Sequence, residues 1–151
     1  MLPLKKIICP TDFSEPSFEG LKTAVELSEK YSAELIILYV VSPAPIVAGV
    51  GAPTALYYPI VSEEMEDHAE NLLENVKTNM IPNHINCRTM IIHGQPAVRI
   101  AEVAQKNGAN IIVMATHGQS GWQRFISGSV TERVVRMASC PVLAVPAPNQ
   151  D

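Results

Sequence analysis

Aromatic side chains and cysteines are scarce in this chain, and each shortage excludes a class of protein. Phe, Trp and Tyr make up 5% of the residues, although 47% of the chain is hydrophobic. A core must therefore be built from Ile, Val, Leu and Ala, which is typical of buried parallel strands covered by helices. The three cysteines, Cys9, Cys87 and Cys140, are odd in number and widely spaced. They match neither a disulfide framework nor a CxxC metal site.

Long apolar runs and an excess of positive charge are also missing. No stretch approaches the roughly 20 apolar residues that span a bilayer, and the first residues lack the apolar core of a secretory signal. The formal net charge of −4 gives no electrostatic reason to expect nucleic acid or an acidic membrane as a partner. We expect a reduced, cytoplasmic protein with one domain over residues 1–151.

Five apolar runs rich in β-branched residues alternate with helical patterns. Because the runs are continuously apolar, they predict strands buried on both faces. The strands are expected at 5–9, 33–41, 86–93, 109–116 and 141–146. Helices are expected after Ser14, from 62 to the stop at Pro82, over 95–108 and over 129–139. The order β-α-β-α-β-α-β-α-β favours an α/β domain with a parallel sheet.

Local signals support these helices. Ser14 is a suitable N-cap with Pro16 in the first turn, and the third helix has Pro96 near its start and Gly108 just past its end. The second helix is expected to present an apolar stripe made of Met65, Ala69, Leu72, Val76 and Met80. The segment 42–61 is too long for an ordinary loop and carries four prolines. We expect it to be mobile, or to be ordered by a ligand or a second subunit.

Polar residues follow the first strand and glycines follow the fourth. Ligands of open α/β sheets bind at the carboxyl ends of the strands, where the strand order reverses. Pro10 ends the first strand, and Thr11 and Asp12 supply a hydroxyl and a carboxylate. After the fourth strand come Gly118, Gly121 and Gly128, three of the eight glycines. The pattern indicates a backbone that is shaped around a ligand.

The last helix opens directly after this glycine cluster. Its free N–H groups and positive dipole make a helix N-terminus an anion site. Gly128 would let a phosphate approach the backbone, and Ser129 and Thr131 would add hydroxyl donors. If the first and fourth strands are neighbours, a carboxylate for ribose faces a phosphate-binding backbone across one crevice.

Four segments together resemble the universal stress protein family. These are "PTDFS" after the first strand, "GQPA" after the third, "MATHG" followed nine residues later by "GSVTERV", and the closing "CPVLAVP". The chain looks like the ATP-binding branch, whose motif is Gly-x2-Gly-x9-Gly-Ser/Thr. That motif runs here from Ala115 to Ser129, with Ala115 in place of the first glycine. The methyl group of Ala115 would crowd the phosphates unless the residue keeps a negative φ.

The resemblance implies an open, doubly wound, Rossmann-like parallel sheet of five strands in the order 3-2-1-4-5, with four helices. It implies that Asp12 and the main chain of Val40 hold adenine beside Met114. Gly118, Gly128, Ser129 and Val130 would hold ribose and phosphates, with Mg²⁺ bound through the phosphates. The candidate site comprises Pro10, Thr11, Asp12, Val40, Met114, Ala115, His117, Gly118, Gly128, Ser129, Val130 and Thr131.

Simpler interpretations stand beside these. Asp12 is also a natural helix-capping or turn residue, and Gly121 a loop hinge. His93 and His117 lie at expected strand ends but have no third ligand at suitable spacing, so we expect no protein metal site. Cys9 is better explained as a small buried hydrophobe than as a nucleophile. Arg124 is better explained as a solvated loop residue than as a contact to the γ-phosphate of a nucleotide. Trp122 fits partner contact or loop packing equally well.

Several enzyme classes are excluded by what the chain does not contain. It has no GxxxxGK[ST] loop, no phospho-receiver pattern and no motif-arranged Ser-His-Asp set, and no base for hydrolysis is identifiable. We predict a stress-response or signalling protein that binds ATP, or another adenine nucleotide, with weak hydrolysis at most. The alternative is a regulatory module that has lost ATP binding. In both cases the apolar edge strand 141–146 predicts a homodimer, as the resemblance also implies.

Overall fold

The computed structural model describes residues 3–42, 63–116 and 129–146. Strands and helices alternate along them as the sequence predicts. The expected segment 42–61 lies outside the described residues, apart from Ser42. The elements are β1 (Lys6–Pro10), α1 (Glu15–Tyr31), β2 (Glu34–Val41), α2 (Glu63–Met80), β3 (Cys87–His93), α3 (Pro96–Asn107), β4 (Ile111–Ala115), α4 (Ser129–Met137) and β5 (Val142–Val145).

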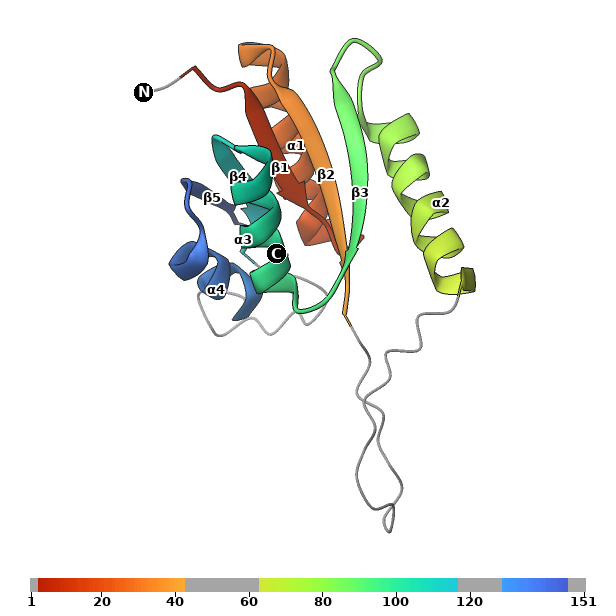
Figure 1. The fold of residues 1–151 in the computed structure, drawn as a ribbon. Helices are drawn as coiled ribbons and strands as arrows, with labels where there is room; N and C mark the ends of the chain where they lie inside the picture. Colours follow the sequence, from red (N-terminus) through yellow and green to blue (C-terminus); the bar gives the residue numbers. More distant parts are fainter. Residues whose placement is uncertain (1–2, 43–62, 117–128, 147–151) are drawn as a thin grey trace, which may run out of the picture.

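The strands form one five-stranded parallel sheet in the order β3-β2-β1-β4-β5 (Figure 1). The predicted fold class is therefore confirmed. From β1 the chain moves outward to β2 and β3, then returns to place β4 on the other side of β1. The strand order reverses between β1 and β4, whose ladder pairs Ile7 with Ile111 and Ile8 with Ile112.

Two layers of helices cover the sheet. Leu21 of α1 and Leu73 of α2 share a core with one face, and Ile100 of α3 and Val134 of α4 pack on the other (Figure 1). Because side chains alternate along a strand, Ile7 and Ile8 lie in different cores. The inner strands β1, β2 and β4 are largely buried, whereas β3 and β5 form the half-buried edges.

The helix ends follow the predicted signals. The Oγ of Ser14 accepts a hydrogen bond of 3.3 Å from the N–H of Ser17 and caps α1. Pro96 opens α3, and Gly108 ends it with a φ of +62°. This left-handed conformation lets backbone N–H groups reach the last helical carbonyls, and glycine adopts it without steric cost.

The buried stripe of α2 differs from the predicted one. Ala69, Leu73 and Val76 are buried, whereas Leu72 is half-buried and Met65 is 49% exposed. Adjacent helical residues point about 100° apart, so only one of the two neighbouring leucines can face β3. The sequence pattern fits either leucine, and packing against the sheet selects Leu73.

Four side chains tie the amino ends of the strands together. Glu34 on β2 accepts a hydrogen bond of 2.7 Å from Arg88 on β3 and lies 3.5 Å from the Nζ of Lys6 on β1. The Arg88 guanidinium also donates to the side chain of Asn107 at the end of α3 (2.7 Å). The hydrogen bond from Arg88 holds the pKa of Glu34 below its ordinary value. This cluster lies at the amino ends of the strands, whereas the predicted site lies at their carboxyl ends.

Candidate functional site

The turn after β1 is held by the side chain of Thr11. The backbone N–H of this residue donates to the carbonyl of Leu38 on β2 (2.9 Å). Its buried hydroxyl lies 3.0 Å from the Oγ of Ser17 and accepts from the N–H of Phe13 (3.1 Å). Thr11 therefore fixes both the path of the turn and the position of α1.

Asp12 takes part in the same turn. Its Oδ1 accepts a hydrogen bond of 3.0 Å from the N–H of Ser14 and a second bond from the Ser14 hydroxyl. The carboxylate thus orients the residue that caps α1, as the simpler interpretation of Asp12 proposes. Asp12 is half-buried at the carboxyl edge of the sheet, where the predicted ribose contact would lie.

Phe13 is strained in a way that the sequence does not indicate. Its φ is +63°, a left-handed conformation that residues other than Gly, Asn and Asp seldom adopt. The aromatic ring packs on Tyr39 of β2, with ring centroids 4.8 Å apart. Strain of this kind persists where the surroundings fix the backbone and is common at binding sites. It turns the chain sharply between Asp12 and Ser14.

The end of β4 is enclosed between two helices. Met114 and Ala115 are buried, and the carbonyl of Ala115 accepts a hydrogen bond of 2.8 Å from the hydroxyl of Thr131 in α4. On the α1 side, a Cβ on Gly20 would lie 3.0 Å from the Ala115 nitrogen, so α1 touches the β4 backbone directly. Gly20 was not among the residues predicted from the sequence. A glycine inside an otherwise regular helical pattern was the available signal.

The two strand ends lie side by side. Continued along both strands, the pairing of Ile8 with Ile112 places Pro10 level with Met114. The polar turn after β1 and the first turn of α4 thus flank the point of strand reversal. Val40 is half-buried near the carboxyl end of β2, the strand on the other side of β1.

Gly94, from the predicted "GQPA" segment, lies beyond β3. Its N–H donates to the carbonyl of Val41 (3.0 Å), and its φ of +135° requires glycine. A Cβ there would lie 2.9 Å from the Cγ of Arg99. The motif therefore shapes the turn into α3 at the same edge of the sheet.

Some predicted positions lie outside the described residues. These are His117, Gly118, Gly121, Trp122, Arg124 and Gly128. Ser129 begins α4, but its side chain is not among those described. Val130 is half-buried and packs on the core that α3 and α4 share.

The interpretation of Cys9 as a small buried hydrophobe has structural support. Burial raises the pKa of the Cys9 thiol to about 12, so Cys9 remains a protonated core residue. The Nε2 of His93 lies 2.7 Å from the Oε1 of Glu66 on α2. Within the described ranges, no three His, Cys, Asp or Glu side chains cluster as a metal site. No described helix is long and apolar enough to cross a membrane.

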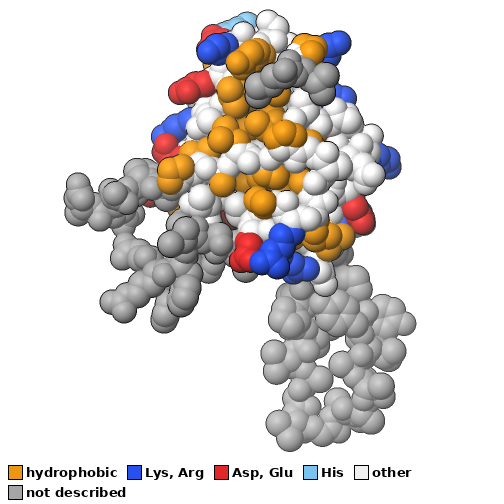
Figure 2. Space-filling view, turned by 90° about the vertical axis from the view of Figure 1, so that its left-hand side faces the viewer, with side chains coloured by type: hydrophobic (Ala, Val, Ile, Leu, Met, Phe, Trp, Pro, Cys, Tyr) orange, Lys and Arg blue, Asp and Glu red, His pale blue; other side chains and the backbone are white. Residues whose placement is uncertain are grey.

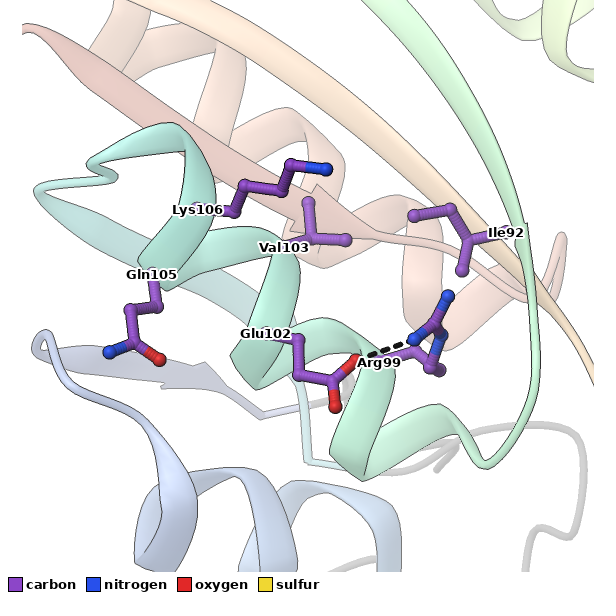
Figure 3. Close-up of a pocket in the computed structure, with 6 residues that line it drawn as sticks. All are labelled: Ile92, Arg99, Glu102, Val103, Gln105 and Lys106. Atoms are coloured by element: carbon purple, nitrogen blue, oxygen red, sulfur yellow. Dashed lines mark hydrogen bonds and ion pairs between the residues drawn. The ribbon is translucent and has the colours of Figure 1, made fainter.

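An open depression of about 420 Å³ lies elsewhere, between β3 and α3 (Figure 3). Arg99 there forms an ion pair of 2.6 Å with Glu102, and Ile92 faces the helix from the strand. The lining residues are Ile92, Arg99, Glu102, Val103, Gln105 and Lys106. None of them belongs to the predicted site. We place the candidate site at the strand ends because the polar turn follows β1 and the start of α4 is bonded to the end of the neighbouring strand β4.

The sheet order and the reversal between β1 and β4 define a doubly wound α/β protein. A family model described as the universal stress protein family matches residues 3–146. Universal stress protein MJ0531 of Methanocaldococcus jannaschii is 37% identical over 147 residues, which cover 97% of this chain and 85% of the relative. The chain belongs to the universal stress protein family.

Solved structures of universal stress proteins have the same fold as this chain. Protein MJ0577, also from M. jannaschii, matches with a TM-score of 0.83 and 29% identity over 99% of this chain and all of the other. Two more distant structures share the fold. One is a universal stress protein in complex with cAMP (TM-score 0.62, 21% identity, 93% of this chain and 95% of the other). The other, from Archaeoglobus fulgidus, is in complex with dAMP (TM-score 0.63, 16% identity, 95% and 98%).

Proposed function

We propose that this chain binds an adenine nucleotide, ATP in the first instance, at the carboxyl ends of β1 and β4. The observation that carries the proposal is that the Thr11–Asp12 turn follows β1 while the start of α4 is bonded to the end of β4, so that both flank the point of strand reversal. Strand reversal is where open α/β sheets bind ligands, and a helix start favours phosphate. The distant family members in complex with cAMP and dAMP support the choice of an adenine nucleotide.

Ala115 is compatible with this proposal. Among the described residues other than glycine, only Phe13 and Ser32 have a positive φ, so Ala115 keeps a conformation open to any side chain. Side chains alternate along β4, and Val113 belongs to the core beneath α1. The methyl group of Ala115 therefore lies on the α1 side, away from α4. This geometry favours retained ATP binding over the alternative of a module that has lost it.

The proposed site keeps the predicted residues, with one change of role. Asp12 and the main chain of Val40 would hold the base and ribose beside Pro10, Thr11 and Met114. Phosphates would contact the start of α4 at Gly128, Ser129 and Val130. His117 and Gly118, which come earlier in the chain, belong to the same proposed site. The Thr131 hydroxyl donates to Ala115, so we assign Thr131 to holding the backbone and not to donating to a phosphate. Mg²⁺ would be bound through the phosphate oxygens.

We further propose a homodimer through β5, in a single cytoplasmic domain that acts in stress response or signalling by binding nucleotide. Leu143 on β5 and Val135 and Met137 on α4 are 38%, 55% and 46% exposed. Figure 2, which views the molecule from the β5 side, shows hydrophobic side chains gathered on this face. An edge strand with exposed apolar side chains and unpaired backbone groups favours pairing with a second copy.

Calorimetry with ATP, ADP, AMP and cyclic AMP, each with Mg²⁺, tests the nucleotide proposal. The parent is expected to bind at least one of them, and Gly128→Val is expected to abolish binding while circular dichroism stays unchanged. The branched side chain would occupy the space that the family motif assigns to phosphate. The absence of binding at millimolar nucleotide would leave the alternative, a regulatory module without ATP.

A further inference from the structure

Thr131 makes an unusual contact for a residue in the first turn of a helix. Threonine at a helix start commonly accepts a hydrogen bond from a free N–H of its own helix. Thr131 is 5% exposed, and its hydroxyl instead donates to the carbonyl of Ala115, the last residue of β4. This bond joins the start of α4 directly to the sheet.

Ala115 is held from further directions as well. Gly20 of α1 packs against its nitrogen from the other face of the sheet, so closely that a Cβ at position 20 would lie 3.0 Å away. The next residue, Thr116, donates its N–H to the carbonyl of Val145 at the end of β5 (2.9 Å). The end of β4 is thus a fixed point to which the Thr131 bond ties α4.

Other polar contacts of α4 do not provide this tie. Arg133 donates to Gln95 at the start of α3 (3.3 Å), and Arg136 pairs with Glu132 on the same helix. These groups are exposed, so their bonds are weakened by water. A buried hydrogen bond is expected to restrict the helix start more than these surface contacts do.

We infer that Thr131 is a positioning residue of the nucleotide site: its hydroxyl, bonded to the Ala115 carbonyl, sets where the first N–H groups of α4 stand relative to β4. This inference rests on the proposed nucleotide function. In the proposed complex, the phosphates bind N–H groups of α4 while the nucleoside contacts β1 and β4. Both sets of contacts can form only if the start of α4 stands at a fixed distance from the ends of these strands. Removal of the tie should therefore weaken the phosphate contacts and spare the nucleoside contacts.

Affinities for ATP and adenosine, measured by calorimetry on four proteins, test the inference. Thr131→Val keeps the shape and removes the hydroxyl, and Thr131→Ser restores it. Thr23→Val is the matched control, because the Thr23 hydroxyl donates to a carbonyl within its own helix (Glu19, 3.2 Å). We expect Thr131→Val to weaken ATP binding about tenfold, and Thr131→Ser and Thr23→Val to stay within about twofold of the parent. Adenosine binding should change less than about twofold in all of them.

Undiminished ATP affinity in Thr131→Val, or equal losses for ATP and adenosine, would overturn the positioning role. A parent that binds adenosine and not ATP would overturn it too. A parent that binds no nucleotide or nucleoside would overturn the proposed function, and this inference with it. Should Thr131→Val unfold, the comparison of Thr131→Ser with Thr131→Ala decides, since both side chains are smaller than threonine and differ in the hydroxyl.

Discussion

Gly20 stands in the middle of α1, where alanine would stabilise an isolated helix by about 1 kcal/mol. At this position a Cβ would lie 3.0 Å from the Ala115 nitrogen and 3.2 Å from the Met114 carbonyl carbon. Both atoms belong to the backbone of a buried strand, which cannot move aside as a flexible side chain would. The requirement at Gly20 is therefore close packing and not a special backbone angle.

We expect Gly20→Ala to lower the free energy of unfolding by about 1 kcal/mol, because overpacking of roughly 1–3 kcal/mol exceeds the gain in helix propensity. Urea denaturation measures the effect. Glu26→Ala, on an exposed position of the same helix, gains propensity without the contact and serves as the control. A Gly20→Ala protein as stable as the parent would contradict the close packing of α1 on β4.

Glu34 makes part of the stability depend on pH. Its pKa in the folded state lies below the ordinary value of 4.5, chiefly because of the hydrogen bond from Arg88. A lowered carboxyl pKa contributes stability that is fully present well above 4.5 and is lost as the pH falls through the folded value. The Glu34→Gln protein lacks this contribution at every pH.

We therefore expect Glu34→Gln to be less stable than the parent at pH 7, with a difference that shrinks as the pH falls below 4.5. Thermal unfolding across the acid range measures both proteins. Glu102→Gln, which alters an exposed ion pair on α3, is the control and should show little difference. A gap between Glu34→Gln and the parent that widens in acid would show that the sign is wrong.

At the scale of single elements, α1 depends on the turn that precedes it. Ser14 accepts from the N–H of Ser17, and the Ser14 N–H and hydroxyl both bind Asp12. One residue thus caps the helix and completes the turn at the candidate site. Removal of its side chain leaves the Ser17 N–H without its cap and takes from Asp12 the bond to the hydroxyl, whereas the bond from the backbone N–H of residue 14 is retained.

Ser14→Ala is expected to reduce the free energy of unfolding by about 1 kcal/mol, the usual effect of losing a serine N-cap. Urea denaturation with the exposed Ser139→Ala as control measures the change. Nucleotide affinity should also fall, because Asp12 loses one of the two bonds by which Ser14 orients it. Equal stability of the two variants would argue against Ser14 as the cap.

Local chemistry explains which features of the elements could be predicted. Ser14, Pro96 and Gly108 act within a few residues of their own position, so the sequence alone indicates the helix ends that they make. Gly20 and Phe13 depend on contacts with β4 and β2, which only the folded sheet supplies. Leu72 and Leu73 satisfy the same pattern, and tertiary packing decides between them.

The candidate site also combines features that the sequence predicts with features that depend on tertiary contacts. The turn at Thr11 and Asp12 could be located because a buried strand ends there in polar residues. The bond between Thr131 and Ala115 could not, because it joins residues whose relation depends on how α4 packs against β4. The sequence pattern assigned the Thr131 hydroxyl to a ligand, whereas the fold gives it a backbone partner.

At the scale of the whole molecule, the proposed homodimer depends on β5. Leu143 projects from an edge strand whose neighbour α4 exposes Val135 and Met137. A lysine at position 143 would bring two positive charges together across a two-fold axis. We expect light scattering to show a dimer for the parent and a monomer, or at least a roughly tenfold weaker dimer, for Leu143→Lys.

The control is Met65→Lys, which places the same charge on a similarly exposed apolar position of α2 at a distance from β5. It should leave the dimer intact. The proposal that β5 is the interface would be wrong if the parent were monomeric at high concentration. It would also be wrong if Leu143→Lys dimerised with unchanged affinity.

The pairing of β1 with β4 also governs when the site can exist during folding. Lys6 and Asn110, which are bonded where the two strands begin, are 104 positions apart in the chain. Contacts across so long a separation close late, whereas β1, α1, β2, α2 and β3 pair through neighbouring segments. A chain leaving the ribosome can therefore build three strands of the sheet while it still lacks β4 and α4, which form the second side of the proposed nucleotide site. During refolding, helical circular dichroism should return before nucleotide binding, which makes bound nucleotide a reporter of the completed fold.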